Sequence, residues 1–235
     1  MRVGIIIPAL NAARHLPELI ESIRAVDAGW PIILVNDGSR DETETVARGL
    51  DLIVLKHDTN RGKGAALKTG FARALSMNLD AVIQMDADLQ HQASALPDFL
   101  GAFGSGRYDL IVGRRDFHDG RMPWPRRMSN TMTSWAVSRA CGTHVPDSQS
   151  GYRMIARRVL ELVHATADAF DFESEFLVRA AQAGFRVGSV PIPTVYGNER
   201  SAIRPWRDTW QFIKLMGLFW RKRPRNQVHG AQEPA

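Results

Sequence analysis

The sequence predicts an α/β fold, with one domain built on a mostly parallel sheet that has helices on both faces. Over the first half of the chain, short β-branched apolar runs alternate with segments whose apolar residues recur at helical spacing, and this alternation is typical of parallel sheets. The 235 residues, of which 44% are hydrophobic, are enough to bury one core. Polar segments follow the apolar runs. Because ligands collect at the carboxyl ends of strands in such sheets, these segments are candidates for a binding site.

Five apolar runs predict strands. They cover residues 3–7, 32–35, 52–55, 81–85 and 109–113. Pro8 follows the first run and, because it lacks a backbone N–H, predicts the end of that strand.

Helices are expected between these strands. Apolar residues at helical spacing predict helices around residues 16–23 and over residues 64–77. Ser39 and Glu42 have the spacing of a capping box, which predicts a helix that begins directly after a turn. Another helix is expected before the fifth strand. Beyond about residue 115 the alternation stops, and two helices near residues 129–140 and 173–183 are expected in a second half of the same domain.

Two carboxylates mark the end of the fourth predicted strand. Asp86 and Asp88 flank Ala87, and Gln90 follows. Carboxylates around a small residue can turn toward one hard cation, so the pattern predicts Mg²⁺ or Mn²⁺ held by Asp86 and Asp88 together with waters and diphosphate oxygens. Such an ion would neutralise charge on a departing nucleoside diphosphate. The alternative, a polar turn between strand and helix, fits this motif equally well in isolation.

Two further loops are candidates for contacts with a nucleotide. Asp37 follows the second strand and could accept hydrogen bonds from a base or ribose, although Ser39 beside it also fits an ordinary helix cap. Gly62, Lys63 and Gly64 open a helix, where backbone N–H groups and a lysine can approach phosphate. Without further context, this loop is equally an ordinary helix start.

Together, seven short motifs resemble the family-two glycosyltransferases of the GT-A fold, and most nearly the polyprenyl- or dolichyl-phosphate hexosyltransferases. The resemblance covers roughly residues 3–205. Each motif is weak, but they occur in the family's order, which makes coincidence improbable. They lie at residues 7–11, 35–41, 60–66, 85–91, 112–115, 147–153 and 172–176.

The resemblance implies a metal-dependent enzyme that moves a hexose from a UDP- or GDP-sugar with inversion. It implies a nucleoside pocket lined by Pro8, Val35 and Asp37. Asp88 and Gln90 resemble the metal ligands, with Asp86 and the backbone of Ala87 close to the diphosphate and sugar. Arg115 is similar to an arginine that contacts phosphate. Leu10 and Ala12 replace the family's usual Tyr and Glu, which leaves the base open.

The acceptor decides whether the reaction needs a base. A lipid phosphate, with a second pKa near ~6, arrives largely ionised, whereas a sugar hydroxyl must lose a proton. Glu173 is the candidate base, with Asp147 and Asp171 as the other available carboxylates. Alternatively, Glu173 is an acid that complements the dipole at a helix N-terminus.

Four arginines are candidates to bind an anionic acceptor. Arg126, Arg127 and Arg153 lie in or near the later motifs, and Arg200 lies in a segment that matches the family's late basic loop only loosely. For each of the first three, a solvated surface arginine is an equal alternative.

The C-terminal segment differs from the rest of the chain. Residues 196–235 contain eight Lys or Arg and three acids, which accounts for the whole net charge of +5. This placement disfavours a nucleic-acid-binding surface and favours contact of one end with an anionic surface. Residues 206–225 predict an amphipathic basic helix in a membrane interface, after a domain of residues 1–205 and before a disordered tail at 226–235. Docking of this helix on its own domain or on a dimer partner is the alternative.

Three functions stay open at this stage. They are transfer to a membrane lipid, transfer to a soluble or glycolipid hydroxyl acceptor, and a non-catalytic nucleotide-sugar-binding membrane scaffold. With one cysteine, Cys141, and no signal peptide or membrane-spanning run, we expect a cytoplasmic protein that is peripheral on the inner face of the membrane.

Overall fold

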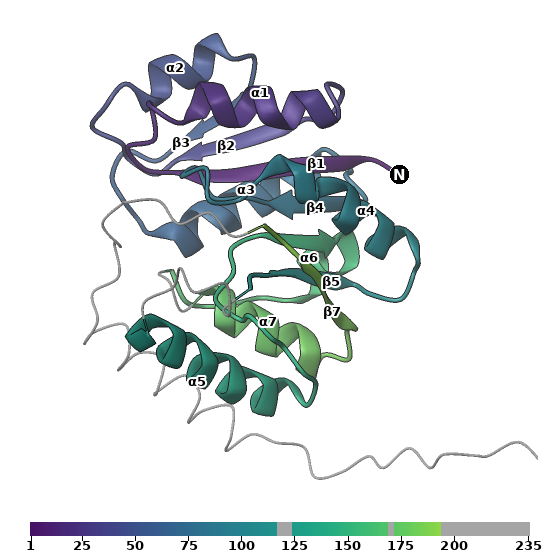
Figure 1. Ribbon diagram of the computed structural model, residues 1–235. Coiled ribbons are helices and arrows are strands. Elements are labelled where there is room, and N and C mark those ends of the chain that lie inside the picture. The colour runs from purple at the N-terminus through teal and green to yellow at the C-terminus, as the bar shows by residue number, and fades with distance from the viewer. Residues whose placement is uncertain (117–123, 169–171, 194–235) are drawn as a thin grey trace, which may run out of the picture.

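A seven-stranded sheet runs through the centre of the protein (Figure 1). The computed structural model describes residues 1–116, 124–168 and 172–193, with side chains described from residue 127 onward in the middle segment. The strands follow one another in space in the order β3-β2-β1-β4-β6-β5-β7. They are β1 (Val3–Ala9), β2 (Ile32–Asn36), β3 (Ile53–Lys56), β4 (Ala81–Gln84), β5 (Leu110–Arg114), β6 (Arg153–Ala156) and β7 (Val187–Pro191).

The sheet is mostly parallel, as the alternating pattern predicts. The pairs β1–β2, β1–β4, β2–β3 and β5–β7 are parallel, whereas β6 lies antiparallel between β4 and β5. The carboxyl ends of β1, β2 and β4 therefore meet at one edge, where the polar segments of the sequence follow them. The predicted α/β class with one mostly parallel sheet is confirmed.

Helices cover both faces and divide the apolar side chains into two cores. In β1, Ile5 and Ile7 point into one core and Ile6 into the other, as the two-residue period of a strand requires. The first core lies under α1 (Leu16–Val26), α2 (Thr43–Gly49), the 3₁₀ turn Ala93–Ala95 and α4 (Leu96–Gly104). The second lies under α3 (Lys63–Ser76), α5 (Trp124–Cys141), α6 (Arg157–Leu162) and α7 (Phe172–Gln182).

Two local expectations are wrong. Strand β1 does not end before Pro8 but continues to Ala9. Strand β4 pairs with β1 only as far as Ile6. No hydrogen bond to β4 therefore requires the backbone N–H that Pro8 lacks. The capping box is also absent, because α2 begins at Thr43 and the Ser39 hydroxyl accepts a hydrogen bond from the N–H of Asn11 (2.9 Å) instead.

The second half of the domain holds more sheet than its sequence indicates. Strands β6 and β7 and the short helix α6 occur where only loops and two helices were expected. The helix expected at residues 129–140 begins five residues earlier, at Trp124. The predicted C-terminal helix and tail lie outside the described residues. Within the described part of the chain, no helix is both long and apolar enough to cross a membrane.

Candidate active site

A tight turn after β4 brings the predicted metal ligands together. The backbone N–H of Asp86 donates to Nδ1 of His91 (2.9 Å), and the N–H of Gln90 donates to Oδ1 of Asp88 (3.0 Å). Leu89 has a φ of +62°, which reverses the chain between these bonds. Asp86, Asp88 and Gln90 are all half-buried, so they line the surface of the site and are not part of the core.

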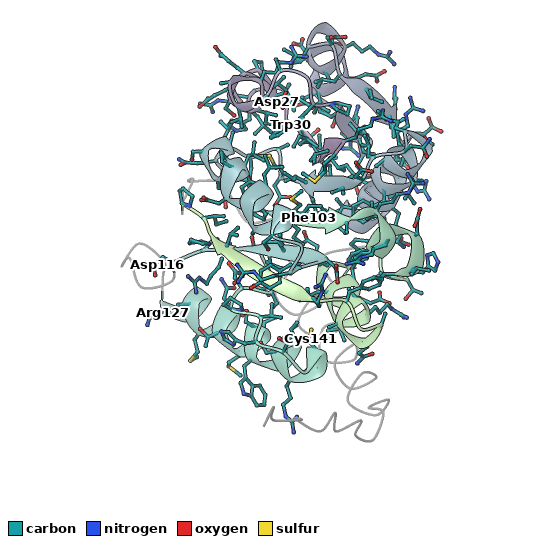
Figure 2. All side chains as sticks on the ribbon, turned by 90° about the vertical axis from the view of Figure 1, so that its right-hand side faces the viewer. Asp27, Trp30, Phe103, Asp116, Arg127 and Cys141 are labelled. Atoms are coloured by element: carbon teal, nitrogen blue, oxygen red, sulfur yellow. The ribbon has the colours of Figure 1, made fainter. Side chains whose placement is uncertain are left out.

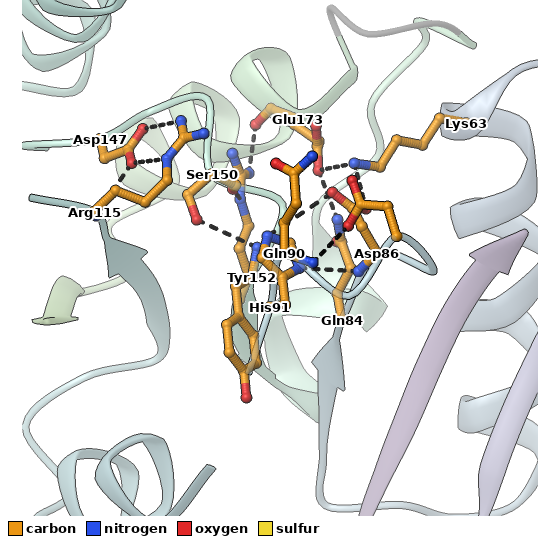
Figure 3. A network of polar contacts seen from close by, with 12 residues as sticks. Lys63, Gln84, Asp86, Gln90, His91, Arg115, Asp147, Ser150, Tyr152 and Glu173 are labelled. Atoms are coloured by element: carbon orange, nitrogen blue, oxygen red, sulfur yellow. Dashed lines mark hydrogen bonds and ion pairs between the residues drawn. The ribbon is translucent and has the colours of Figure 1, made fainter. Parts of the chain in front are cut away.

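Lys63 connects this turn to α7 (Figure 3). Its Nζ lies 2.6 Å from Oδ1 of Asp86 and 3.1 Å from Oε1 of Glu173. Gln84, the last residue of β4, donates through Nε2 to the same Glu173 oxygen at 2.6 Å. Glu173 is only 6% exposed. Lys63 was expected beside a phosphate, but its ammonium group is held here by two carboxylates.

Burial and charge shift the pKa values of these groups. Burial opposes the charge on Lys63, but attraction to Asp86 and Glu173 outweighs it and raises the pKa of Lys63. Burial likewise opposes ionisation of Asp86, yet the nearby Lys63 lowers the pKa of Asp86. Burial and then the charge of Asp86 raise the pKa of Asp88. Asp88 is therefore the carboxylate of this turn whose charge is least compensated.

His91 supports the turn as a neutral ring. Burial lowers the pKa of His91 despite the nearby Asp86 and Asp88. Because Nδ1 accepts the N–H of Asp86, the proton of the neutral ring resides on Nε2. The ring also stacks on Tyr152, with 4.9 Å between ring centroids. His91 thus fixes the backbone from which the Asp86 side chain projects.

Arg115 is clamped by a buried carboxylate. Its Nε and Nη2 donate to Oδ2 and Oδ1 of Asp147 at 2.7 Å and 3.0 Å. Asp147 has no exposed surface. The pair is bidentate, which fixes the plane of the guanidinium group. Asp147, one of the candidate bases, is therefore engaged by Arg115 instead.

Arg153 is a correction to the sequence-based expectation. It is 1% exposed, so it is neither a solvated surface arginine nor an arginine that meets an acceptor at the surface. Its Nε, Nη1 and Nη2 donate to the backbone carbonyls of Ser150, Glu173 and Ser148 at 2.9, 2.6 and 2.8 Å. Arg153 thus ties the segment before β6 to the start of α7. A buried arginine is tolerated because carbonyl oxygens satisfy its donors.

Asp37 organises a neighbouring loop. Its Oδ1 accepts hydrogen bonds from Nδ1 of His57 (2.6 Å) and the N–H of Arg61 (3.0 Å), and its Oδ2 accepts the N–H of Gly62 (2.8 Å). The carboxylate is buried. The predicted role of Asp37 is contact with a base or ribose. Such a contact would come in addition to the hydrogen bonds by which Asp37 already fixes residues 61–62.

The other predicted nucleoside contacts differ from each other. Pro8 is half-buried at the carboxyl end of β1, where a ligand could reach it. Val35 is completely buried and packs in the second core with residues such as Ile6. The prediction that Val35 lines the nucleoside pocket is thus wrong, because its side chain alternates inward along β2.

The first backbone N–H groups of α3 are hydrogen-bonded within the protein. The N–H groups of Gly64 and Ala65 donate to the carbonyl of Asp168 at 3.0 and 3.3 Å. A Cβ on Gly64 would lie 2.7 Å from Cβ of Phe172. Gly64 is therefore required for close packing against the segment before α7. The expectation that this glycine approaches a phosphate is corrected.

Comparison with known proteins identifies the family. Residues 4–163 match the sequence profile of glycosyl transferase family 2, which covers more than half of the chain. The chain is a member of this family. An undecaprenyl-phosphate mannosyltransferase from Micrococcus luteus is 32% identical over 208 residues, which cover 83% of this chain and 84% of that protein. A polyprenol monophosphomannose synthase from Mycolicibacterium smegmatis is 32% identical over 204 residues, covering 81% and 76%.

Solved structures support the fold. Glucosyl-3-phosphoglycerate synthase from Mycobacterium tuberculosis, in complex with Mn²⁺ and UDP-glucose, superposes with a TM-score of 0.75 at 20% identity, over 92% of this chain and 78% of that chain. The domain is therefore GT-A-like. As a family 2 glycosyltransferase, the chain transfers a sugar from a nucleotide sugar, and it belongs among the hexosyltransferases.

Not every predicted site residue of this glycosyltransferase is described. Arg127 is exposed on α5. The side chain of Arg126, and all of Asp171 and Arg200, lie outside the described residues. In the described part of the chain, no three His, Cys, Asp or Glu side chains cluster as a metal site by themselves.

The donor set nevertheless fits a hard divalent cation. Asp88 offers a half-buried carboxylate whose Oδ1 accepts the backbone N–H of Gln90, and the side-chain amide of Gln90 belongs to the same turn. Oxygen ligands of this kind, completed by water and phosphate, suit Mg²⁺ or Mn²⁺. Asp86 is partly committed to Lys63, so it would contribute mainly through its second oxygen.

Sequence reasoning missed several supporting residues. Gln84 ends a strand, and His57 follows one, so each looks like an ordinary edge residue. Gly151 is a third case, because a Cβ there would lie 2.6 Å from Oδ2 of Asp86. The only available signal for Gly151 was its place inside a family-like motif, since no local pattern shows which side chain a glycine faces.

Proposed function

We propose that this glycosyltransferase moves a hexose from a nucleoside-diphosphate sugar to a polyprenyl phosphate at the inner face of the cytoplasmic membrane. The bond from the anomeric carbon to the donor diphosphate breaks, and a bond to an acceptor phosphate oxygen forms. A single displacement inverts the anomeric centre. The nucleoside diphosphate leaves with the bonding electrons.

The observation that carries this proposal is the pairing of the carboxylates around the site. Glu173 accepts bonds from Lys63 and Gln84, and Asp147 accepts two from the guanidinium group of Arg115 and one from its backbone N–H. A carboxylate held by cations and amide donors is a weak base. An acceptor that arrives ionised, such as a lipid phosphate, needs no base. Glu173 is accordingly a residue that positions Lys63.

The names of the relatives point to the same acceptor class. Undecaprenyl phosphate and polyprenol occur in the names of the two bacterial relatives described above. A Methanococcus voltae relative, 27% identical over 218 residues that cover 83% of this chain and 86% of that protein, is a UDP-N-acetylglucosamine–dolichyl-phosphate N-acetylglucosaminyltransferase. These proteins use different sugars, so they support the lipid phosphate and leave the sugar and the base open.

Each charged residue of the site has a defined task in the proposed reaction. Asp88, Gln90 and Asp86 would hold Mg²⁺ or Mn²⁺, which when bound supplies positive charge for the leaving diphosphate. Lys63 fixes the Asp86 carboxylate and partly neutralises the negative charge of that carboxylate. Arg115, oriented by Asp147, would bring the positive charge of its guanidinium group to an anionic oxygen. Arg127, Arg126 and Arg200 are the proposed contacts of the acceptor phosphate, while residues 206–225 would hold the enzyme on the membrane.

Metal dependence and donor choice can be tested together. We expect Mn²⁺ plus the correct UDP- or GDP-sugar to raise the melting temperature, because a ligand that binds only the folded state stabilises it. Chelation with EDTA should abolish turnover, and Asp88→Asn should lower the rate at least ~100-fold with little change in melting temperature. Full activity in excess EDTA, or in Asp88→Asn, would remove the metal from the proposal.

A further inference from the structure

His57 is a buried side chain to which the proposed reaction gives no task. It follows β3, is 6% exposed, and donates its backbone N–H to the carbonyl of Asn36, the last residue of β2, at 2.9 Å. His57 therefore lies at the carboxyl edge of the sheet, opposite the edge where Asp27 and Trp30 precede β2 (Figure 2). Buried polar groups need partners. Because this edge carries the candidate site, the partners of the ring show what His57 holds in place.

Both nitrogens of the His57 ring contact a partner. Nδ1 lies 2.6 Å from Oδ1 of Asp37, and Nε2 lies 3.0 Å from Oγ1 of Thr69 in α3. The Asp37 carboxylate also accepts the backbone N–H groups of Arg61 and Gly62. Because a carboxylate accepts hydrogen bonds, Nδ1 of His57 is the donor in the bond to Asp37. His57 thus helps to fix the rotation of the Asp37 carboxylate.

The turn before α3 (residues 59–62), which Asp37 holds, has little freedom to move. Gly62 has a φ of +99°, a backbone conformation that suits glycine and few other residues. Gly38 follows Asp37, and a Cβ on it would lie 2.5 Å from the carbonyl carbon of Thr59. The loop after β2 and the turn before α3 therefore pack backbone against backbone, and the hydrogen bonds of the Asp37 carboxylate join them.

Lys63 comes directly after this turn and is the first residue of α3. Its Nζ bridges Asp86 and Glu173 at 2.6 and 3.1 Å (Figure 3). A bridge to two carboxylates fixes the ammonium group at one point. A shift of Gly62 would move the backbone from which Lys63 projects, so the side chain would lose a contact or leave its preferred rotamer. The hydrogen bonds of Asp37 therefore act on Lys63, and through Lys63 on the Asp86 carboxylate.

A packing role is the alternative for His57. Thr69 lies further along α3, and its hydroxyl donates to the carbonyl of Ala65 at 3.1 Å. The contact of Nε2 with Thr69 attaches the ring to the side of the helix, whereas the bond of Nδ1 reaches the turn at its start. The two ring nitrogens connect His57 to different parts of the structure, so substitutions can separate their effects.

We propose that His57 is a positioning residue of the sugar transfer. Its Nδ1–H holds the Asp37 carboxylate against the turn before α3, and this turn places Lys63 beside Asp86. The inference rests on the role proposed above for Lys63, which is to fix the Asp86 carboxylate. It gives Asp37 a task within the protein, in addition to the nucleoside contact that the sequence predicts.

Amide hydrogen exchange in the full-length protein tests the first link and needs neither donor nor acceptor. His57→Asn keeps an N–H donor at the position of Nδ1, whereas His57→Gln extends its amide toward Thr69 and leaves Asp37 without that donor. We expect the amide protons of residues 61–62 to exchange at native rates in His57→Asn. In His57→Gln they should exchange at least ~10-fold faster, the factor for a lost hydrogen bond to a charged group.

Two further variants separate this link from packing. Lys56→Ala removes a neighbour that is 51% exposed and pairs with Glu44, and it should leave exchange at residues 61–62 unchanged. Thr69→Val removes the partner of Nε2 and should do the same. The amide protons of β1 report global unfolding, and Thr69→Val decides by itself where a His57 variant is unfolded. Faster exchange in Thr69→Val, or in both folded His57 variants alike, would show a packing role; native exchange in His57→Gln would also overturn the proposal.

Steady-state kinetics test the second link. His57→Gln should lower kcat about ten-fold and leave the donor KM within about three-fold, because the displaced groups are Lys63 and Asp86. A raised donor KM with native kcat would show a lost nucleoside contact instead. In a Lys63→Ala background, adding His57→Gln should change kcat by less than about two-fold, since coupled residues are not additive. Losses that multiply would contradict the link to Lys63.

The failure of the proposed function would look different. If the native enzyme does not glycosylate polyprenyl phosphate but exchange at residues 61–62 follows the prediction, the acceptor is wrong and the link from His57 to the turn stands. If the native enzyme uses polyprenyl phosphate but residues 61–62 exchange alike in His57→Asn and His57→Gln, the positioning role is wrong and the acceptor stands.

Discussion

Gly151→Ala should separate the chemistry of the site from the stability of the fold. Gly151 precedes β6 and faces Asp86 and Lys63, whose ion pair is drawn in Figure 3. A Cβ at this position would lie 2.6 Å from Oδ2 of Asp86 and 2.8 Å from Nζ of Lys63. Ordinary contacts begin at 3.4 Å, so the carboxylate must retreat by about 0.8 Å. Both atoms are side-chain ends, so the backbone can stay in place.

The expected effect is therefore on the rate. A displacement near 1 Å of a catalytic group can cost on the order of 100-fold, so we expect kcat to fall about 10- to 100-fold with a small change in melting temperature. Gly101→Ala in α4 is the control, since a Cβ there meets nothing within 4 Å. That variant should keep its rate and gain up to about 1 kcal/mol of stability. A Gly151→Ala enzyme within two-fold of the native rate would refute the role assigned to the Asp86–Lys63 pair.

Two further variants test other parts of the account. Glu173→Gln should lose about ten-fold or less in steady-state rate, because an ionised acceptor needs no base; a loss equal to that of Asp88→Asn would make Glu173 the base for a hydroxyl acceptor. Burial opposes the charge on Glu175, but hydrogen bonds from Ala167, Thr166 and Arg179 outweigh it and lower its pKa below 4.5. The stabilisation is therefore present above pH 4.5 and is lost as the pH falls through the folded-state pKa. Urea unfolding below pH 4.5 should show a weaker pH dependence in Glu175→Gln, and an unchanged dependence would contradict this.

The sequence predicts the first half of the fold well because its pattern there is regular. Residues 32–35 and 81–85 are uninterrupted apolar runs, and the strands lie at Ile32–Asn36 and Ala81–Gln84. Strand β6 was missed because it begins with an arginine, a residue that is rarely fully buried. Only the tertiary structure shows that three carbonyl oxygens satisfy Arg153. The predicted helix cap at Ser39 is wrong for a related reason. The Ser39 hydroxyl accepts a hydrogen bond from the N–H of Asn11, a residue distant in the sequence.

The candidate site was predictable in its residue types and less so in its connections. Asp86, Asp88 and Gln90 fall on one turn because they are close in sequence. The link from Lys63 to Glu173, and that from Arg115 to Asp147, join residues 110 and 32 positions apart. Pairing at such separations is decided by how the strands are ordered in the sheet. The burial of Val35 follows from the face of β2 on which it lies, which its position before a polar loop did not indicate.

The most direct test of the central claim compares two acceptors that differ only in the phosphate. The full-length enzyme, with Mn²⁺ and the donor that stabilises it, is offered a polyprenyl phosphate or the corresponding polyprenol in detergent, and the glycolipid product is measured. We expect transfer to the phosphate, and none to the alcohol, because Asp86, Glu173 and Asp147 are each paired with Lys63 or Arg115 and Asp88 is assigned to the metal ion. Transfer to the alcohol at a comparable rate would contradict the account.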